Sequence, residues 1–183
     1  AGLGGGSSDA ATVLLVLNRL WNCGLTLPEL AGLGARLGAD VPVFVHGRSA
    51  WGEGIGEQLQ PIDLPERWYL VIRPGCAVNT AAIFNDRELT RDTPITTMAA
   101  FLTDGHRNDC EAVVRKRYPE VDRALTWLAA HGEARMSGTG SCVFAPFATE
   151  QAAREAAARV PAEWERFVAR GINRSPVHEA LYD

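Results

Sequence analysis

The first helix-length stretch of the chain has apolar residues at spacings of three and four. These positions are Ala10, Val13, Leu14, Leu17, Leu20 and Trp21. The spacing predicts an α-helix. Because Leu15 and Val16 fill its other side, we expect this helix to be buried. Asn22 and Gly24 follow it and are typical of a helix end.

A second helix is predicted directly after the first. Thr26-Leu-Pro-Glu29 has the spacing of a capping box, in which the first and fourth residues satisfy each other's backbone amides. We expect this helix to end near Gly38. Proline cannot continue a helix, so Pro42 predicts that Asp40 lies at a bend before an extended apolar segment.

In the rest of the chain, short apolar runs typical of strands alternate with segments whose apolar residues have helical spacing. Strands are expected at residues 49–51, 55–59, 68–72, 142–145 and 167–169. Helices are expected at residues 109–118, 119–130 and 149–160, and a surface loop at 86–105. The alternation lacks a strict βαβ rhythm, which indicates a mixed α/β (α+β) fold. A change of composition near Pro61 and Pro65 predicts two lobes, 1–60 and 61–183.

The composition of the chain argues against nucleic acids and membranes as binding partners. The net charge of −4 argues against a general nucleic-acid surface, and we interpret Arg115–Arg117 as a solvated helix face. No apolar run approaches the ~18 residues that span a bilayer. The four cysteines are scattered and form no C-x-x-C pair, which is typical of reduced thiols in a cytoplasmic protein. We therefore expect no nucleic-acid partner and no membrane partner.

The first twelve residues carry the strongest chemical signal, because glycines lead into two serines and then into the first helix. Glycine lets the backbone approach a ligand closely, and a loop that opens into a helix presents N–H groups at the positive end of the helix dipole. This arrangement suits a phosphate. The candidate phosphate-binding residues are Ala1, Gly2, Leu3, Gly4, Gly5, Gly6, Ser7 and Ser8.

Three other interpretations of this segment are weaker. A common P-loop requires Gly-Lys-Ser/Thr after the glycines, and no lysine lies near. The glycine spacing of a dinucleotide-binding fingerprint is absent, and its expected acidic residue would fall near Glu29, at a helix start. A flexible Gly/Ser connector is disfavoured because the stretch that follows is too apolar for a linker.

Residues 2–11, Gly-Leu-Gly-Gly-Gly-Ser-Ser-Asp-Ala-Ala, resemble the phosphate-binding motif of the superfamily of galactokinase, homoserine, mevalonate and phosphomevalonate kinases, the GHMP kinases. The proline that usually precedes this motif would lie before Ala1, so we expect the chain to be the rear portion of a longer protein. The resemblance implies a two-lobed kinase fold, here the end of the N-terminal lobe plus the C-terminal lobe. It also implies ATP and Mg²⁺, with the active site between the lobes.

The resemblance changes the interpretation of two further segments. By spacing alone, Asp40 is a helix-capping or turn residue, and Ser137-Gly-Thr-Gly-Ser141 is a tight turn. Gly-Ala-Asp-Val-Pro-Val-Phe, residues 38–44, resembles the superfamily segment that supplies the catalytic aspartate, which implies this role for Asp40. The second loop matches the other glycine motif of the superfamily, which implies that Gly138, Thr139 and Gly140 also contact phosphate. The partner lysine of the superfamily would lie upstream of the chain.

Residues 51–57, 73–84 and 108–111 resemble one family within the superfamily, the 4-diphosphocytidyl-2-C-methyl-D-erythritol kinases. This resemblance implies ATP-dependent phosphorylation of the 2-hydroxyl of a cytidyl diphosphate substrate in mevalonate-independent isoprenoid synthesis. It implies that Phe84 stacks on cytosine and that Thr80 and Ile55 line the substrate pocket. Ala81 departs from the proline of this family. Ser7 or Ser8 is a candidate to help place Mg²⁺.

Several alternatives stay open at this point. The chain is alternatively a homoserine or mevalonate kinase, in which Phe84 is a core residue, or a non-catalytic nucleotide-binding relative. A dinucleotide-dependent oxidoreductase is a more distant alternative. Because the lysine and the adenine contacts would lie upstream, we expect no turnover from this chain alone.

Overall fold

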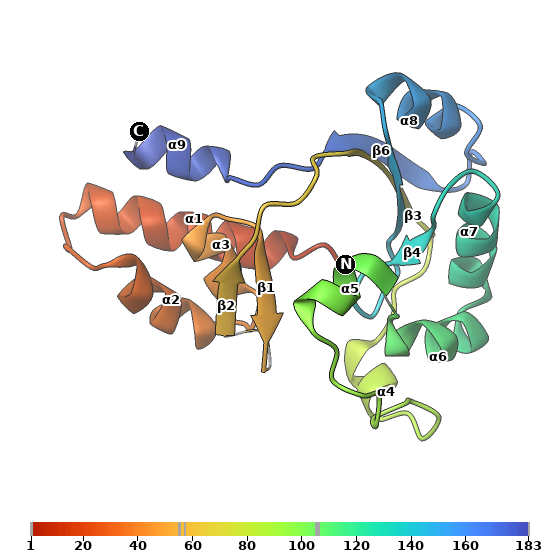
Figure 1. The fold of residues 1–183 in the computed structure, drawn as a ribbon, viewed down its shortest axis with the longest axis horizontal. Coiled ribbons are helices and arrows are strands. Elements are labelled where there is room, and N and C mark those ends of the chain that lie inside the picture. The colour runs from red at the N-terminus through yellow and green to blue at the C-terminus, as the bar shows by residue number, and fades with distance from the viewer. Residues whose placement is uncertain (1, 55, 57, 105–106, 183) are drawn as a thin grey trace. The chain divides into compact units, whose positions relative to one another are not determined.

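The computed structural model describes residues 2–54, 56, 58–104 and 107–182. The chain divides into two compact units, which are treated separately below (Figure 1). The helical unit comprises residues 4–66 and 172–183, and the sheet unit comprises residues 67–171 with the start of the chain up to Leu3.

The helical unit contains helices that pack against one another and one β-hairpin. Its elements are α1 (Gly5–Leu20), α2 (Leu27–Ala35), α3 (Val41–His46), β1 (Ala50–Glu53), β2 (Gln58–Pro61) and α9 (Pro176–Tyr182). The predicted first helix is confirmed, and so is the capping box of α2, in which the Thr26 hydroxyl accepts from the Glu29 amide. β1 and β2 form an antiparallel hairpin, with Ala50 paired to Pro61, close to the strands expected at residues 49–51 and 55–59.

The core of the helical unit lies between α1, α2 and α3. Its buried residues are Ala11, Leu15, Leu30, Ala31, Val41 and Val45. The expectation that α1 is wholly buried is wrong for this chain, because Val13 is 55% exposed and Leu20 is 67% exposed. Within the described chain α1 contacts α2, α3 and α9, which cover one side of it only.

The segment after Asp40 is a helix, so the prediction of an extended segment is wrong. Pro42 lies in the first turn of α3, where proline is tolerated because the amide there has no intrahelical partner. Gly47 ends α3 with a positive φ of 62°. The Nε2 atom of buried His178 lies 2.8 Å from the Val45 carbonyl oxygen, which fixes α9 against α3.

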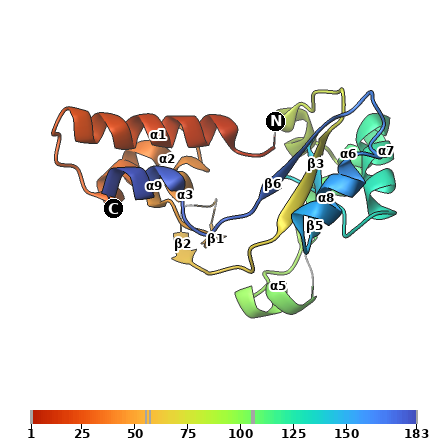
Figure 2. The same cartoon turned by 90° about the horizontal axis from the view of Figure 1, so that it is seen from above.

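The sheet unit is a four-stranded antiparallel sheet with helices on one face (Figure 1 and Figure 2). Its strand order is β4 (Arg135–Met136), β5 (Val143–Phe147), β3 (Trp68–Arg73), β6 (Glu165–Arg170). Its helices are α4 (Thr80–Phe84), α5 (Met98–Asp104), α6 (Asp109–Arg117), α7 (Pro119–Ala129) and α8 (Glu150–Ala157). The mixed α/β class and the predicted strands of this unit are confirmed, whereas α5 lies where a surface loop was expected.

The face of the sheet that carries Leu70 and Ile72 packs on α6, α7 and α8. Leu70 pairs with Ala145 of β5 and with Val168 of β6, so the apolar positions of three strands lie in register. These side chains and those of the helices form the core of the unit. Along β3, Leu70, Val71 and Ile72 are all buried, whereas Trp68 and Tyr69 are partly buried and Arg73 is exposed.

The chain passes from the helical unit to the sheet unit between Glu66 and Arg67, and returns at Ile172. The lobes 1–60 and 61–183 expected from the sequence differ from this division, because the last segment belongs to the helical unit. Asn173 holds that segment in place. Its amide nitrogen donates to the Leu64 carbonyl at 2.8 Å, and its amide oxygen accepts from the Leu64 N–H at 2.9 Å.

No helix in the described ranges combines the length and the apolar character needed to cross a membrane.

Candidate active site

The two glycine segments meet in the sheet unit at Gly2. Gly2 has a φ of 94°, and a Cβ built on it would lie only 2.8 Å from the Ser137 carbonyl oxygen and 3.0 Å from that of Gly140. The Ser137 hydroxyl donates a hydrogen bond to the Gly2 carbonyl. Glycine is required at position 2 both for its backbone angle and for this close approach. The start of the chain is therefore packed on the second glycine loop.

Asn108 holds the second glycine loop from the side. Its amide nitrogen donates to the Gly138 carbonyl at 2.7 Å and to the Met136 carbonyl at 3.1 Å. Its amide oxygen accepts from the Cys110 N–H at 3.0 Å and so caps α6. In the sequence, Asn108 was noted only as part of residues 108–111, which resemble one kinase family, and no contact was predicted for it. Its position before a helix that begins Asp-Cys-Glu was a capping signal, but nothing local indicated the loop as its second partner.

Thr80 was expected to line the substrate pocket, and Thr139 was expected to contact phosphate. The two side chains lie in contact. Their hydroxyl oxygens are 2.9 Å apart, and either hydroxyl can be the donor. Thr80 is the first residue of α4, and Asn79 caps the helix by accepting from the Ala82 N–H at 3.0 Å. A proline at position 81 would fall in the first turn, where it is tolerated, so Ala81 leaves the helix start unchanged.

Phe84 is the last residue of α4 and is 56% exposed, whereas its neighbour Ile83 is fully buried. The alternative that Phe84 is a core residue is therefore wrong. Thr80 and Phe84 are four residues apart on one helix, so they lie on the same face. The sheet unit thus brings together the second glycine loop, the threonine pair and an exposed aromatic ring.

The helical unit holds the other half of the glycine segment. Gly4 has a φ of 65°, and a Cβ there would lie 2.9 Å from the Phe44 ring. The first helical hydrogen bond runs from the Ser8 N–H to the Gly4 carbonyl at 2.9 Å, so the amides of residues 5–7 have no partner within α1. A Cβ built on Gly5 or Gly6 meets no described atom within 4 Å, so the space beside these residues is open.

Ser7 and Ser8 both lie in the first turn of α1, which carries no acidic side chain. An acid-free helix start with open amides suits an anion. Ser8 also lines a cavity of about 440 Å³ beside Phe44 and residues 172–176. Leu3 is 44% exposed. Two further candidate residues, Ala1 and Ile55, lie outside the described residues.

Asp40 occupies the N-cap position of α3, but its carboxylate makes no capping hydrogen bond there. The residue is exposed. The interpretation of Asp40 as a side-chain helix cap is therefore wrong. Its segment lies beside the start of α1, since the Ser7 hydroxyl would be 3.8 Å from a Cβ built on Gly38. Hydroxyl and carboxylate oxygens from adjoining segments are ligands that suit Mg²⁺.

The described titratable side chains outside these segments bear on metal binding and on thiol reactivity. Among the described residues, no group of three or more His, Cys, Asp or Glu side chains is placed to hold a metal ion. Burial, with a smaller effect from Asp109, raises the pKa of the Cys110 thiol, and burial with a smaller effect from Glu120 raises the pKa of Cys76. A raised pKa lowers the thiolate fraction, so both thiols are expected to react slowly.

The basic run on α6 is neutralised by carboxylates. Arg115 Nε lies 2.6 Å from Asp122 Oδ1, Lys116 Nζ lies 2.6 Å from Glu88 Oε1, and Arg117 forms an ion pair with Asp86. Each of the three cations thus has an acidic partner. The run is therefore part of a set of ion pairs as well as a solvated helix face.

Comparison with known protein families decides the classification. Residues 1–48 match the GHMP kinases N terminal domain, and residues 87–166 match the GHMP kinases C terminal domain. The two matches together cover more than half of the chain. The chain belongs to the GHMP kinases. The N-terminal match contains the first glycine segment and Asp40, and the C-terminal match contains the second glycine segment.

Curated GHMP kinases resemble the chain closely. The 4-diphosphocytidyl-2-C-methyl-D-erythritol kinase of Alkalilimnicola ehrlichii is 60% identical over 171 residues, which cover 93% of this chain and 59% of the relative. The kinase of the same name from Halorhodospira halophila is 56% identical over 183 residues, which cover 98% of this chain and 64% of the relative. The chain therefore spans about three fifths of the length of these relatives.

Two solved GHMP kinase structures have the same fold. A crystal structure of 4-(cytidine 5'-diphospho)-2C-methyl-D-erythritol kinase matches with a TM-score of 0.78 and 34% identity, over 93% of this chain and 66% of that chain. Homoserine kinase from Cytophaga hutchinsonii matches with a TM-score of 0.62 and 16% identity, over 96% of this chain and 67% of that chain. The second match shows the fold alone.

Proposed function

We propose that the protein is a 4-diphosphocytidyl-2-C-methyl-D-erythritol kinase, which transfers the γ-phosphate of ATP to the 2-hydroxyl of its substrate. The observation that carries this proposal is the contact between Thr139 and Thr80. It joins the second glycine loop to the helix that ends in the exposed ring of Phe84. Homoserine and mevalonate, the acceptor substrates of the alternative kinases, contain no base that could stack on such a ring. The names of the relatives at 56% and 60% identity support the same substrate.

The glycine residues would bind ATP through the backbone. The open amides at the start of α1, at residues 5–7, point their partial positive charge toward a phosphate. Gly138, Thr139 and Gly140 would contact phosphate from the second loop, which Gly2 and Asn108 hold in place. Most of the catalysis in phosphoryl transfer is positioning and charge stabilisation, and both loops would supply these.

Asp40 would take the proton of the substrate hydroxyl as it attacks the γ-phosphate in line. Ser7 or Ser8 would help to place Mg²⁺. When bound, the ion supplies positive charge to the phosphate oxygens. Phe84 would stack on the cytosine ring, and Thr80 and Ile55 would line the pocket. We also propose a cytoplasmic location, which the free, scattered cysteines support.

The substrate is tested with the full-length gene product, ATP and Mg²⁺, and the cytidyl substrate, homoserine or mevalonate in parallel, with ADP release as the readout. ADP formed only with the cytidyl substrate supports the proposal. ADP formed with homoserine or mevalonate would leave the family assignment unchanged and show that the proposed substrate is wrong. No ADP with any of them would favour a non-catalytic nucleotide-binding relative.

Two substitutions test the assigned roles. Asp40→Asn removes the proton acceptor and is expected to lower kcat at least ~100-fold, whereas Asp63→Asn changes another exposed aspartate of the helical unit as its control. Phe84→Ala is expected to raise KM for the cytidyl substrate about 10-fold or more, because a base–aromatic stack is lost. Phe167→Ala is the matched control, since Phe167 is also an exposed phenylalanine of the sheet unit, at 49%. If Phe84→Ala behaves like Phe167→Ala, the stacking role is wrong.

A further inference from the structure

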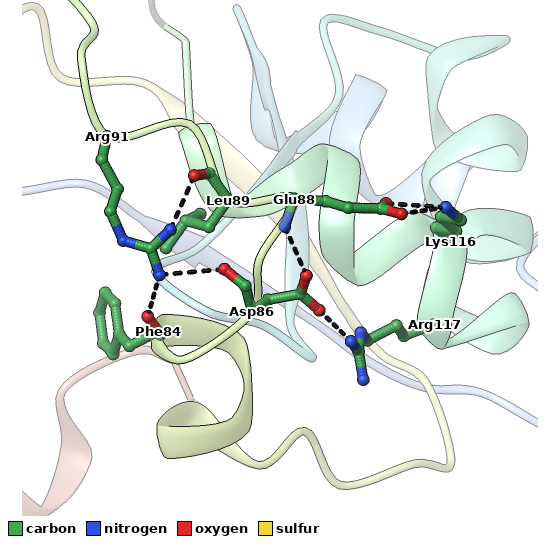
Figure 3. A network of polar contacts seen from close by, with 7 residues as sticks. All are labelled: Phe84, Asp86, Glu88, Leu89, Arg91, Lys116 and Arg117. Carbon is green, nitrogen blue, oxygen red and sulfur yellow. Dashed lines mark hydrogen bonds and ion pairs between the residues drawn. The ribbon is translucent and has the colours of Figure 1, made fainter.

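We infer that Arg91 is a positioning residue, which holds the end of α4 so that the Phe84 ring is fixed for base stacking, and that Asp86 and Arg117 anchor the same loop. This inference rests on the proposed function of Phe84. It concerns the polar network that follows α4 in the sheet unit (Figure 3).

The guanidinium of Arg91 is wrapped by the backbone that it stabilises. It donates to the carbonyl oxygens of Phe84 at 2.6 Å, Asp86 at 3.0 Å and Leu89 at 3.0 Å (Figure 3). The last carbonyls of a helix have no intrahelical partner, and a cation near them is favourable. A guanidinium has five N–H donors in a fixed plane, so one side chain can satisfy several carbonyls at once. Arg91 therefore acts as a C-terminal cap for α4 that includes the backbone of Phe84 itself.

Asp86 fixes the same loop from the protein interior. Its side chain is only 3% exposed. One carboxylate oxygen accepts from the Glu88 N–H at 2.8 Å, and the other forms an ion pair with Arg117 of α6. Glu88 adds a second ion pair to α6, since Lys116 Nζ lies 2.6 Å and 2.7 Å from its two oxygens. The loop after Phe84 is thus tied to α6 at two points.

Phe84 needs this support because its own side chain is largely outside the core. Its ring is 56% exposed, and α4 is a helix of only five residues. Ile83 is fully buried and fixes the helix before Phe84, while Arg91 fixes the backbone after it. An exposed ring on a mobile backbone would lose conformational freedom when a base stacks on it. A backbone held in advance reduces that loss, so the network is expected to strengthen binding of the base.

The expected effect is a change in substrate affinity with little change in chemistry. Arg91→Met removes the three hydrogen bonds and keeps a side chain of similar length. It is expected to raise KM for the cytidyl substrate about 3- to 10-fold, with KM for ATP and kcat within about 2-fold of wild type. Arg91→Lys keeps the charge and reaches fewer carbonyls. Its KM for the cytidyl substrate is expected to lie between that of wild type and that of Arg91→Met. Arg87→Met is the matched control, because Arg87 is an exposed arginine of the same loop.

The test is a double-mutant cycle between Arg91→Met and Phe84→Ala in the full-length gene product. The inference predicts that Arg91→Met has no further effect on KM once the Phe84 ring is absent, and that Arg91→Lys partly restores KM. An equal rise in KM with and without the ring would overturn it. The inference would also be overturned if Arg91→Met left KM unchanged while Phe84→Ala alone raised it. That result would not contradict the proposed function. If Phe84→Ala alone has no effect, the stacking role and this inference fail together. If Arg91→Met does not fold, the same double-mutant cycle with Phe84→Ala is measured with Asp86→Asn, which removes the charge that pairs with Arg117.

Discussion

Substitution of Asn108 separates two contributions that this side chain makes in the sheet unit. One is the cap on α6, through the 3.0 Å hydrogen bond from the Cys110 N–H. The other is the pair of hydrogen bonds to the Gly138 and Met136 carbonyls. Asn108→Ser keeps a good capping oxygen but is too short to reach the two carbonyls, whereas Asn108→Ala removes both contributions.

The magnitudes follow from these contacts. Each lost hydrogen bond to the loop has a net value of about 0.5–1.5 kcal/mol, and the low end applies because the side chain is only partly buried. Asn108→Ser is therefore expected to lower the free energy of unfolding by about 1 kcal/mol. Loss of the cap adds about 1 kcal/mol, so Asn108→Ala is expected to lower it by about 2 kcal/mol.

Urea unfolding measures both values, and ATP saturation kinetics on the full-length gene product test the function. Both variants are expected to raise KM for ATP to the same extent, because both release the loop that carries Thr139. The reasoning is refuted if Asn108→Ser matches wild type in stability and in KM for ATP, since Asn108 would then act only as a helix cap.

Two further predictions concern packing and thiol chemistry. Gly47→Ala is expected to lower the free energy of unfolding by more than about 2 kcal/mol, because the residue has a φ of 62° and its Cβ would lie 2.1 Å from the His178 ring. Gly32→Ala in α2, where a Cβ meets no described atom within 4 Å, is the control in urea unfolding and is expected to stabilise the helix slightly. In a timed alkylation followed by mass spectrometry, exposed Cys23 is expected to react first. Burial raises the pKa of Cys110, so its reaction is expected to be slower and to accelerate as the pH rises; equal rates for the two thiols would contradict this assignment.

Local signals explain which elements the sequence predicted well. The capping box at Thr26–Glu29 and the apolar run of β3 are both set by neighbouring residues, and both were found. The start of α3 was missed because Pro42 was taken as a helix breaker, although it lies in the first turn where proline fits. The five-residue α4 is too short to show a helical period.

Features that depend on distant contacts were beyond the sequence. The exposure of Phe84 depends on how α4 packs, and neither spacing nor composition indicates it. The acidic partners of Lys116 and Arg117 lie about thirty residues earlier in the chain, so the basic run was expected to be merely solvated. The return of the C-terminal segment to the helical unit depends on the pairing of Asn173 with Leu64.

The threonine pair of the sheet unit has one property that a fixed donor or acceptor lacks. A hydrogen bond between two hydroxyls uses one proton and one lone pair, so the pair of Thr80 and Thr139 retains one proton and several lone pairs for other partners. Rotation of the two hydroxyl protons reverses the polarity of the pair while every heavy atom stays in place. The pair can therefore donate a proton to an acceptor atom or accept one from a donor, with no movement of its heavy atoms.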